Sequence, residues 1–202
     1  MNAKKDAAIL VCLMAFLVFS PLGSAQTATS FSGEAVALRV NALGVSLSAA
    51  DTGPLPSTGG NLSTSLAKVN VLGLASADAL TSTASGSGTS SQSESRLANL
   101  NLLNGLITAK VVDSTSSATC SGSTASTSGN VDIVNLVAAG QSIAVSNPNL
   151  AVSLPGGITL VVNQQTSSSG GSSGSITVNA LHVTGPSIDI VVASSQSGIT
   201  CQ

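Results

Sequence analysis

Short runs of alternating apolar and polar residues recur along most of the chain, and none keeps the 3.6-residue period of a helix. In the first run, Val36, Leu38 and Val40 alternate with less hydrophobic neighbours. A strand over residues 34–41 would therefore present one aliphatic face to a core and point Arg39 outward. At the end of this run the apolar positions shift by one residue, from even-numbered to odd-numbered positions, which predicts a bulge or a tight turn.

Turns rich in Gly, Ser or Pro separate the later runs. Asn104-Gly105, the strongest short hairpin signal, divides residues 97–112 into two strands. Residues 131–145 fit two strands around Gly140, with a short helical turn as the alternative. Three more strands each follow a turn-rich stretch and are expected at 158–162, 176–183 and 188–192.

Three tracts consist mainly of Ser, Thr, Gly and Ala, and span residues 81–95, 114–128 and 166–175. Sequence of this kind is typical of connections, so we expect long solvated loops, with partner or glycan attachment as the alternative. The predicted fold class is all-β: an antiparallel β-sandwich-like domain with long Ser/Thr/Gly-rich loops. A β-solenoid is the alternative, although the chain shows no fixed repeat period.

The N-terminal residues have the pattern of a signal peptide: two lysines, an apolar region at 7–19, and the small residues Gly23-Ser24-Ala25. A membrane anchor is the alternative, but this apolar region falls short of the roughly 20 residues that cross a bilayer. We expect a signal peptide at 1–25 and a single all-β extracellular domain at 26–202, with no membrane span after cleavage. The protein would be exported, and be secreted, periplasmic or held at the cell surface.

Cleavage would remove Cys12 and leave Cys120 and Cys201 in an oxidising compartment, where an even pair usually forms a bridge. A Cys120–Cys201 disulfide is therefore predicted, with free thiols or an intermolecular bridge as alternatives. Closing a loop of about 80 residues would stabilise the fold by roughly 4 to 5 kcal/mol. A lipid anchor on Cys12 is not expected, because Val11 stands where a lipoprotein signal needs a small residue.

Composition narrows the range of partners. Charged residues make up 7% of the chain and aromatic residues 1%, and the formal net charge is −2. Single-stranded nucleic acid is usually held by basic grooves with aromatic stacking platforms, so no nucleic-acid partner is expected. After cleavage Phe31 would be the remaining aromatic residue, which also disfavours sugar platforms built from aromatic rings.

His182 is the single histidine of the chain. It could join Asp189 in a Ser-His-Asp arrangement, but nothing marks a particular Ser as the nucleophile. We favour a structural histidine with a hydrogen-bond partner. A zinc site needs more ligands than this chain supplies, and the aspartates lack the spacing of a calcium loop, so no metal or cofactor is predicted.

Two short motifs match known signatures in the wrong context. Residues 170–174 (GGSSG) fit the GxSxG nucleophile elbow, which works only between a strand and a helix, yet they lie in a Gly/Ser tract. Residues 55–59 (LPSTG) fit the LPxTG sorting signal of wall-attached proteins, yet no hydrophobic stretch and basic tail follow them. We expect the first to arise from composition alone and the second to be a Pro/Gly turn.

Seven segments, spread along the chain, carry a resemblance to a known family: FSGEA (31–35), VNALG (40–44), DTGPLP (51–56), ANLNLLNGLITA (98–109), LPGG (154–157), LVVNQ (160–164) and ITVNALHV (176–183). With them the chain resembles the choice-of-anchor P family of exported bacterial proteins over nearly all of its expected mature length. The resemblance implies a surface or secreted protein and carries over no catalytic residue. Since no hydrophobic tail precedes Cys201-Gln202, release is expected rather than covalent anchoring.

These observations predict a non-enzymatic secreted or cell-surface structural or adhesive β-domain. An extracellular ligand- or polymer-binding module is the alternative, and a hydrolase using His182 is a remote one. The partners we expect are a cell-surface polymer or a second copy of the chain, which would pair through strand edges that carry few charges.

Overall fold

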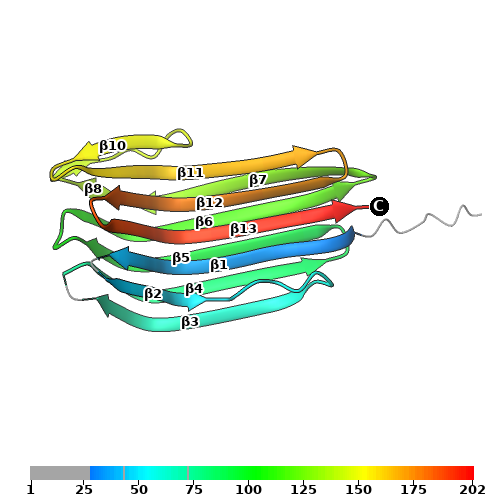
Figure 1. Cartoon of the computed structure of the whole chain (residues 1–202), viewed down its shortest axis with the longest axis horizontal. Helices are drawn as coiled ribbons and strands as arrows, with labels where there is room; N and C mark the ends of the chain where they lie inside the picture. The colour runs from blue at the N-terminus through cyan, green and yellow to red at the C-terminus, as the bar shows by residue number, and fades with distance from the viewer. Residues whose placement is uncertain (1–27, 43, 72) are drawn as a thin grey trace, which may run out of the picture.

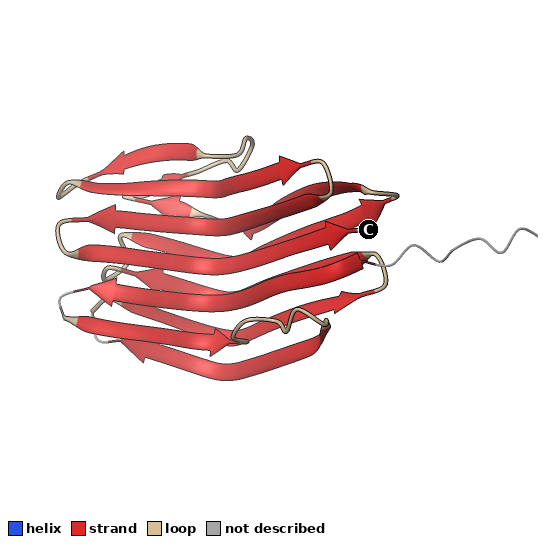
Figure 2. Cartoon of the chain, turned by 45° about the vertical axis from the view of Figure 1, so that its right-hand side comes forward, coloured by secondary structure: helices blue, strands red, loops and turns tan. Residues whose placement is uncertain are grey.

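The computed structural model describes residues 28–202, apart from residues 43 and 72. The expected signal peptide therefore lies outside the described residues. The described part of the chain folds into strands and turns without a helix, so no helix there could span a membrane (Figure 2). Its strands form two antiparallel sheets.

Sheet A has the strand order β10-β11-β12-β13-β1-β2. Its strands are β1 (Ala28–Ala42), β2 (Val45–Asp51), β10 (Leu150–Leu154), β11 (Ile158–Gly170), β12 (Ser173–Gly185) and β13 (Ile188–Cys201). The first and last strands, β1 and β13, pair along their whole length at the centre of this sheet. The two ends of the described chain are therefore joined side by side.

Sheet B has the strand order β3-β4-β5-β6-β8-β9, with β7 also paired to β6. Its strands are β3 (Gly60–Val71), β4 (Ala75–Ser87), β5 (Ser90–Leu102), β6 (Ile107–Ser121), β7 (Thr124–Val134), β8 (Val137–Ala138) and β9 (Gln141–Ser142). In the stacked layers, β1 packs on β4 and β5, β13 on β5 and β6, and β12 on β6 and β7 (Figure 1). The predicted antiparallel sandwich is confirmed, and the alternative of a solenoid is wrong.

Local turn signals placed the turns correctly, but the strands extend beyond the predicted ranges: the strand expected at 188–192 is part of β13, Ile188–Cys201. The hairpin at Asn104-Gly105 lies between β5 and β6, and both residues have positive φ, 55° and 89°. The expected strands after residue 157 fall within β11, β12 and β13. Around Gly140 the structure has two short strands, β8 and β9, and no helical turn.

Each strand longer than ten residues, except β7, changes its side-chain alternation at one level of the sandwich; β7 alternates regularly from end to end. In sheet A two consecutive residues face the core, and in sheet B two consecutive residues face outward. One residue of many of these doublets has positive φ, which reverses the pleat and bends the strand, and Asn163 and Asn99 are examples at 53° and 51°. The inward doublets are Ala37-Leu38, Ala49-Ala50, Val162-Asn163, Ala180-Leu181 and Val192-Ala193; the outward ones are Ala67-Lys68, Asp78-Ala79, Ala98-Asn99 and Lys110-Val111.

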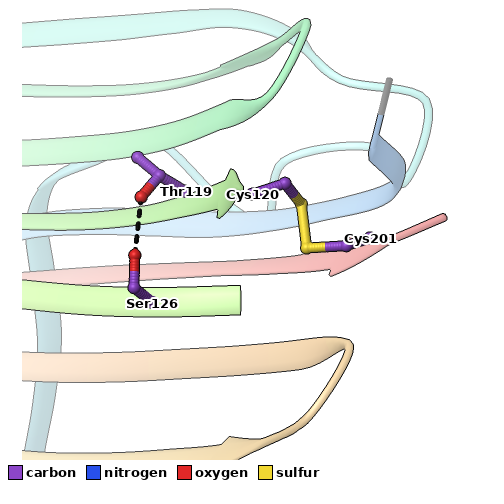
Figure 3. Close-up of a disulfide and its surroundings, with 4 residues drawn as sticks. All are labelled: Thr119, Cys120, Ser126 and Cys201. Carbon is purple, nitrogen blue, oxygen red and sulfur yellow. Dashed lines mark hydrogen bonds between the residues drawn. A yellow bond between two sulfur atoms is a disulfide. The ribbon is translucent and has the colours of Figure 1, made fainter. Parts of the chain in front are cut away.

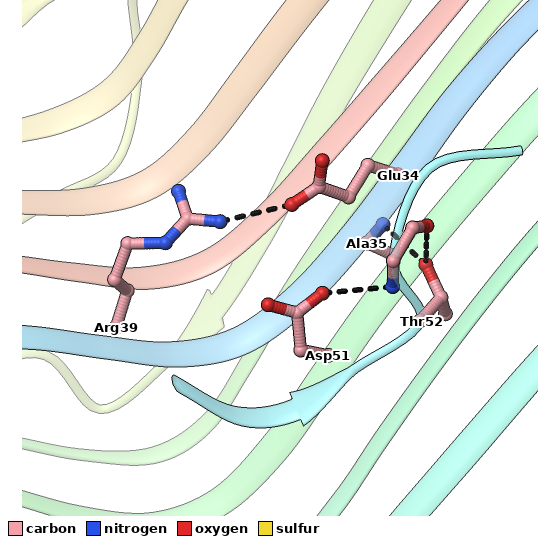
Figure 4. Close-up of polar contacts among 6 residues, drawn as sticks. Glu34, Ala35, Arg39, Asp51 and Thr52 are labelled. Carbon is pink, nitrogen blue, oxygen red and sulfur yellow. Dashed lines mark hydrogen bonds and ion pairs between the residues drawn. The ribbon is translucent and has the colours of Figure 1, made fainter. Parts of the chain in front are cut away.

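The doublets of both sheets point in the same direction in space, because inward from sheet A is outward from sheet B. Both sheets therefore bend together and stay stacked (Figure 2). The bend also explains the Glu34–Arg39 ion pair, with Nη2 and Oε1 2.9 Å apart (Figure 4). Residues five apart lie on opposite faces of a regular strand, and the doublet between them brings these two to one face.

The bend divides the interior into an aliphatic half and a serine half. On one side Leu, Val and Ile fill the core, including Leu38, Leu102 and Ile107, each 0% exposed. On the other side the inward positions are mostly Ser, Ala and Gly. The buried serines there are Ser82, Ser91, Ser93, Ser95, Ser114, Ser116, Ser195 and Ser197.

Hydroxyl groups join the two sheets directly in the serine half. Ser93 Oγ donates to the backbone carbonyl of Gln196 at 2.6 Å, and Ser91 Oγ to that of Ser32 at 2.8 Å. Ser116 Oγ and Ser197 Oγ lie 2.9 Å apart. Because a serine side chain is short, these bonds require a close approach of the sheets.

The three Ser/Thr/Gly tracts are strands, so the prediction of long loops is wrong. Each tract forms the tip of a hairpin, β4–β5, β6–β7 or β11–β12. Each turn has two residues with glycine first: Gly88, Gly122 and Gly171 have φ of 57°, 62° and 57°. In the first two tracts, alternate hydroxyls such as those of Ser93 and Ser116 are buried against the opposite sheet and the others face water, whereas residues 166–170 of the third tract are exposed on both faces.

The predicted disulfide joins Cys120 at the end of β6 to Cys201 at the end of β13 (Figure 3). The Cα atoms are 5.6 Å apart and 81 positions separate the two residues in sequence. Beside the bridge, the Thr119 and Ser126 hydroxyls are 2.9 Å apart. Since β6 and β13 belong to different sheets, the disulfide fixes one sheet to the other at the tip of the serine half.

The close approach of the sheets predicts that one added methyl group will destabilise the fold. At Gly86 a Cβ atom would lie 2.8 Å from Phe31 Cγ and 2.9 Å from Leu55 Cδ2, so Gly86→Ala should lower the free energy of unfolding by about 1–3 kcal/mol. Gly170→Ala, which meets nothing within 4 Å, is the matched control and should change it by less than about 0.5 kcal/mol. Urea unfolding measures both; equal effects would contradict close packing.

Loss of the disulfide should destabilise the sandwich strongly. We expect Cys120→Ser/Cys201→Ser to lower the free energy of unfolding by roughly 4 kcal/mol, because the bridge restricts an 81-residue loop in the unfolded chain. The comparison is urea unfolding of the oxidised protein and of the double variant. Reduced wild-type protein should match the variant, and unchanged unfolding on reduction would show that the bridge contributes little.

Candidate functional site

His182 lies on β12, on the outer face of sheet A, with its side chain 22% exposed. Its Nδ1 atom is 3.0 Å from Gln164 Oε1, and its Nε2 atom is 3.0 Å from Asp189 Oδ1. The ring therefore links β11, β12 and β13. No hydrogen bond joins it to a serine hydroxyl within the described residues, and both ring nitrogens already have oxygen partners.

The two sequence motifs belong to turns. The GxSxG match at 170–174 spans the β11–β12 hairpin, with Gly170 and Ser173 paired across the turn. A nucleophile elbow needs a strand followed by a helix, and here one strand follows another. The local geometry is thus that of a hairpin rather than an elbow.

The LPxTG match at 55–59 lies in the connection from β2 to β3, which is bound along β1. The backbone N–H of Leu55 donates to Gly33 O at 2.7 Å, and that of Phe31 donates to Ser57 O at 3.0 Å. The connection begins with Thr52, whose Oγ1 accepts from the Ala35 N–H at 3.0 Å (Figure 4). The motif is therefore a docked turn, as predicted, and buried Leu55 closes the end of the core.

The outer face of sheet B in the serine half carries a regular array of polar side chains. Alternate residues of β4, β5, β6 and β7 face outward there, and strand pairing aligns them in ranks across the sheet. We call these residues the hydroxyl array. Its ranks are Thr81, Arg96, Asp113 and Asp132; Thr83, Glu94, Thr115 and Asn130; Ser85, Gln92, Ser117 and Ser128; and Ser87, Ser90, Thr119 and Ser126.

The two middle ranks of the hydroxyl array surround a pocket of about 250 Å³. Short side chains such as Ser117 and Ser128 form part of the lining, and the longer Gln92 and Glu94 also contribute. The lining offers hydroxyl and amide groups, which both donate and accept hydrogen bonds, together with one carboxylate. This arrangement can bind a ligand with many hydroxyl groups.

Three carboxylates gather at one side of the array, on β5, β6 and β7. Asp113 is opposite Asp132 in the strand pairing and lies one rank from Glu94. Burial raises the pKa of Asp113, the neighbouring Glu94 raises that pKa further, and Arg96 acts against them while Asp132 adds to the rise. No group of three metal-binding side chains suited to an ion occurs in the described part of the chain.

From the sequence, these aspartates were considered only for a calcium loop, and the hydroxyl array was not predicted. The available signal was the hairpin turn: residues equally far from a turn at Gly122 face each other, which places Asp113 opposite Asp132. The same rule at Gly88 places Thr83 opposite Glu94. The array was missed because the tracts that contain it were assigned to loops.

Comparison with known proteins gave no match among family models, curated proteins or solved structures. What the fold and the site define is a class: an all-β sandwich with a disulfide and a hydroxyl-rich outer face. The resemblance to the choice-of-anchor P family stays a prediction from the sequence phrases.

The raised pKa of Asp113 gives a pH-dependent prediction. The folded state binds this proton more tightly than the unfolded state, so ionisation of Asp113 lowers stability as pH rises above the ordinary value of 3.8. Asp113→Asn should therefore raise the free energy of unfolding at pH 7, with the difference shrinking as pH falls below 3.8. Glu94→Gln removes the repulsion between Glu94 and Asp113 but leaves Asp113 buried, so it should raise the free energy of unfolding by less than Asp113→Asn does.

Urea unfolding of wild type and of both variants, at pH 7 and at a pH below 3.8, measures the change in the free energy of unfolding. An Asp113→Asn protein that is less stable than wild type at neutral pH would mean that the Arg96–Asp113 contact, at 3.9 Å, outweighs the burial of the carboxylate.

Proposed function

We propose that this protein is a non-enzymatic extracellular structural or adhesive β-domain that makes contact through the hydroxyl array of sheet B. The observation that carries the proposal is the alignment of Ser, Thr, Asn and Gln side chains in ranks around a pocket of about 250 Å³. Such a face suits a polymer that itself presents rows of hydroxyl groups.

The physical argument rests on rigidity and repetition. Ser and Thr side chains are short, so holding them for binding costs little rotamer entropy. Each hydroxyl both donates and accepts, so it fits a hydroxyl of the partner in either direction. One such bond contributes little, but many bonds formed by one face add through multivalency. Adhesion of this kind needs no aromatic platform.

Export is part of the proposal. The expected signal peptide at 1–25 and the Cys120–Cys201 bridge both favour an oxidising compartment outside the cytoplasm. The resemblance to choice-of-anchor P proteins points to the same places: secreted, periplasmic or cell-surface. The second candidate function, a binding module for a discrete ligand, is favoured by the pocket and by Glu94 within it.

The test is binding of the protein without residues 1–25 to cellulose, chitin and immobilised dextran, all neutral hydroxyl-rich polymers. We expect retention on at least one of them. Thr83→Ala/Thr115→Ala/Ser117→Ala should weaken it by about tenfold or more, because each hydrogen bond contributes about 0.5–1.5 kcal/mol. Binding isotherms measured by depletion give the change.

A matched triple variant on the other sheet is the control. Thr166→Ala/Ser175→Ala/Thr177→Ala removes hydroxyls from the outer face of sheet A, where Thr166 pairs with Thr177, and should leave binding unchanged. His182→Ala should also bind as wild type does. Binding to none of the polymers, or equal binding by the array variant, would count against the proposal, and release of soluble sugar that depends on His182 would favour the hydrolase.

A further inference from the structure

Strand β3 forms one edge of sheet B and pairs only with β4 among the described strands. It is the lowermost strand in Figure 1 and extends for 12 residues. Its outer side therefore presents a row of backbone N–H and C=O groups to solvent. Such a row is a ready template for another strand.

The usual protection of an edge strand is missing from most of β3. Protective features are charged side chains, proline and bulges that turn the edge away. From residue 60 to residue 67 the strand has no charge and no proline, and Lys68 is its single charged residue. The opposite side of the sandwich is better closed, since Gln165 Nε2 of β11 reaches Gly129 O of β7 at 3.5 Å.

An apolar side chain is also left uncovered at this edge. Leu66 is 40% exposed, although its position in the alternation directs it to the inner face of the sheet. Leu62 lies on the same face and is half-buried. A strand added beside β3 would cover both.

We propose that β3 pairs with β3 of a second copy of this chain, antiparallel and centred on Thr64, to join two B sheets into one. In this register Leu62 faces Leu66 of the second copy, and Ser63 faces Ser65 of the second copy. The contact is isologous, so each pair occurs twice about a two-fold axis. The proposal does not depend on the hydroxyl array.

The sequence of β3 favours its own copy over an unrelated strand. Directly opposed residues share a face, so the register places apolar beside apolar and hydroxyl beside hydroxyl, combinations that stabilise strand pairs. Lys68 falls opposite Gly60 of the second copy, which keeps the two lysines at opposite ends of the joint. Thr64 meets itself at the axis, where a hydroxyl can both donate and accept.

Sedimentation velocity of the oxidised protein without residues 1–25 tests the pairing. The wild-type protein should sediment as a dimer. Ser63→Lys/Ser65→Lys, at two exposed positions, places lysines opposite lysines and should give a monomer; Ser63→Glu/Ser65→Glu should do the same. An equimolar mixture of the two variants should recover the dimer, because opposite charges then face each other.

The matched control places the same charges on the other long edge strand of sheet B. Ser126→Lys/Ser128→Lys changes two exposed residues of β7 and should remain a dimer. Circular dichroism and thermal unfolding verify that each variant is folded. A wild-type protein that is monomeric at all concentrations, or a dimer that survives Ser63→Lys/Ser65→Lys, overturns the proposal.

The register has its own test. Opposed Cα atoms in an antiparallel pair are about 4.5–5.5 Å apart, a separation that a disulfide can bridge. Thr64→Cys should form a disulfide-linked dimer on oxidation, and Ser63→Cys should link to Ser65→Cys but not to itself. Efficient self-linking of Ser63→Cys, or none by Thr64→Cys, excludes a joint centred on Thr64.

Discussion

The close approach of the two sheets in the serine half is the constraint on which the rest of the structure depends. Ser91 and Ser93 reach backbone carbonyls of the opposite sheet, and this requires small residues around these contacts and opposite the larger side chains, as Gly86 is opposite Phe31. At Gly129 an added Cβ would clash with Val178. Most of the buried serines replace aliphatic packing with hydrogen bonds, while the buried Ser114 and Ser195 hydroxyls have no hydrogen-bond partner among the described residues. The scarcity of large side chains in these tracts therefore follows from the packing.

The shared bend allows one set of strands to serve two kinds of interior. A regular strand keeps its inner face from end to end, but here the doublets exchange the faces at one level. Leu38 and Leu181 lie inward on the aliphatic side of that level, and Ser195 and Ser197 on the other. Because the doublets of both sheets point the same way, neither sheet separates from the other. The bend thus joins the aliphatic half and the serine half within a single sandwich, without a domain boundary.

Local signals in the sequence predicted the turns well and the Ser/Thr/Gly tracts badly, so the strand expected at 158–162 ended short of β11, Ile158–Gly170. The hairpin at Asn104-Gly105 and the Cys120–Cys201 bridge follow from turn chemistry and cysteine pairing. The Ser/Thr/Gly tracts form strands because of contacts between distant residues: Ser93 meets Gln196, 103 positions away. Composition alone does not contain that partner. The hydroxyl array was missed for the same reason, since only strand pairing brings its residues together.

The interior and the outer face of the serine half are consequences of the same alternation. On β5, Ser93 and Ser95 are buried while Gln92 and Glu94 face solvent. Cross-sheet hydrogen bonds, the disulfide and the pairing of β1 with β13 all hold the inward set in place. A fixed inward set leaves little freedom for the backbone, and the spacing of the outward side chains is then fixed as well. The packing that requires small residues inside therefore also gives the outer array its rigidity.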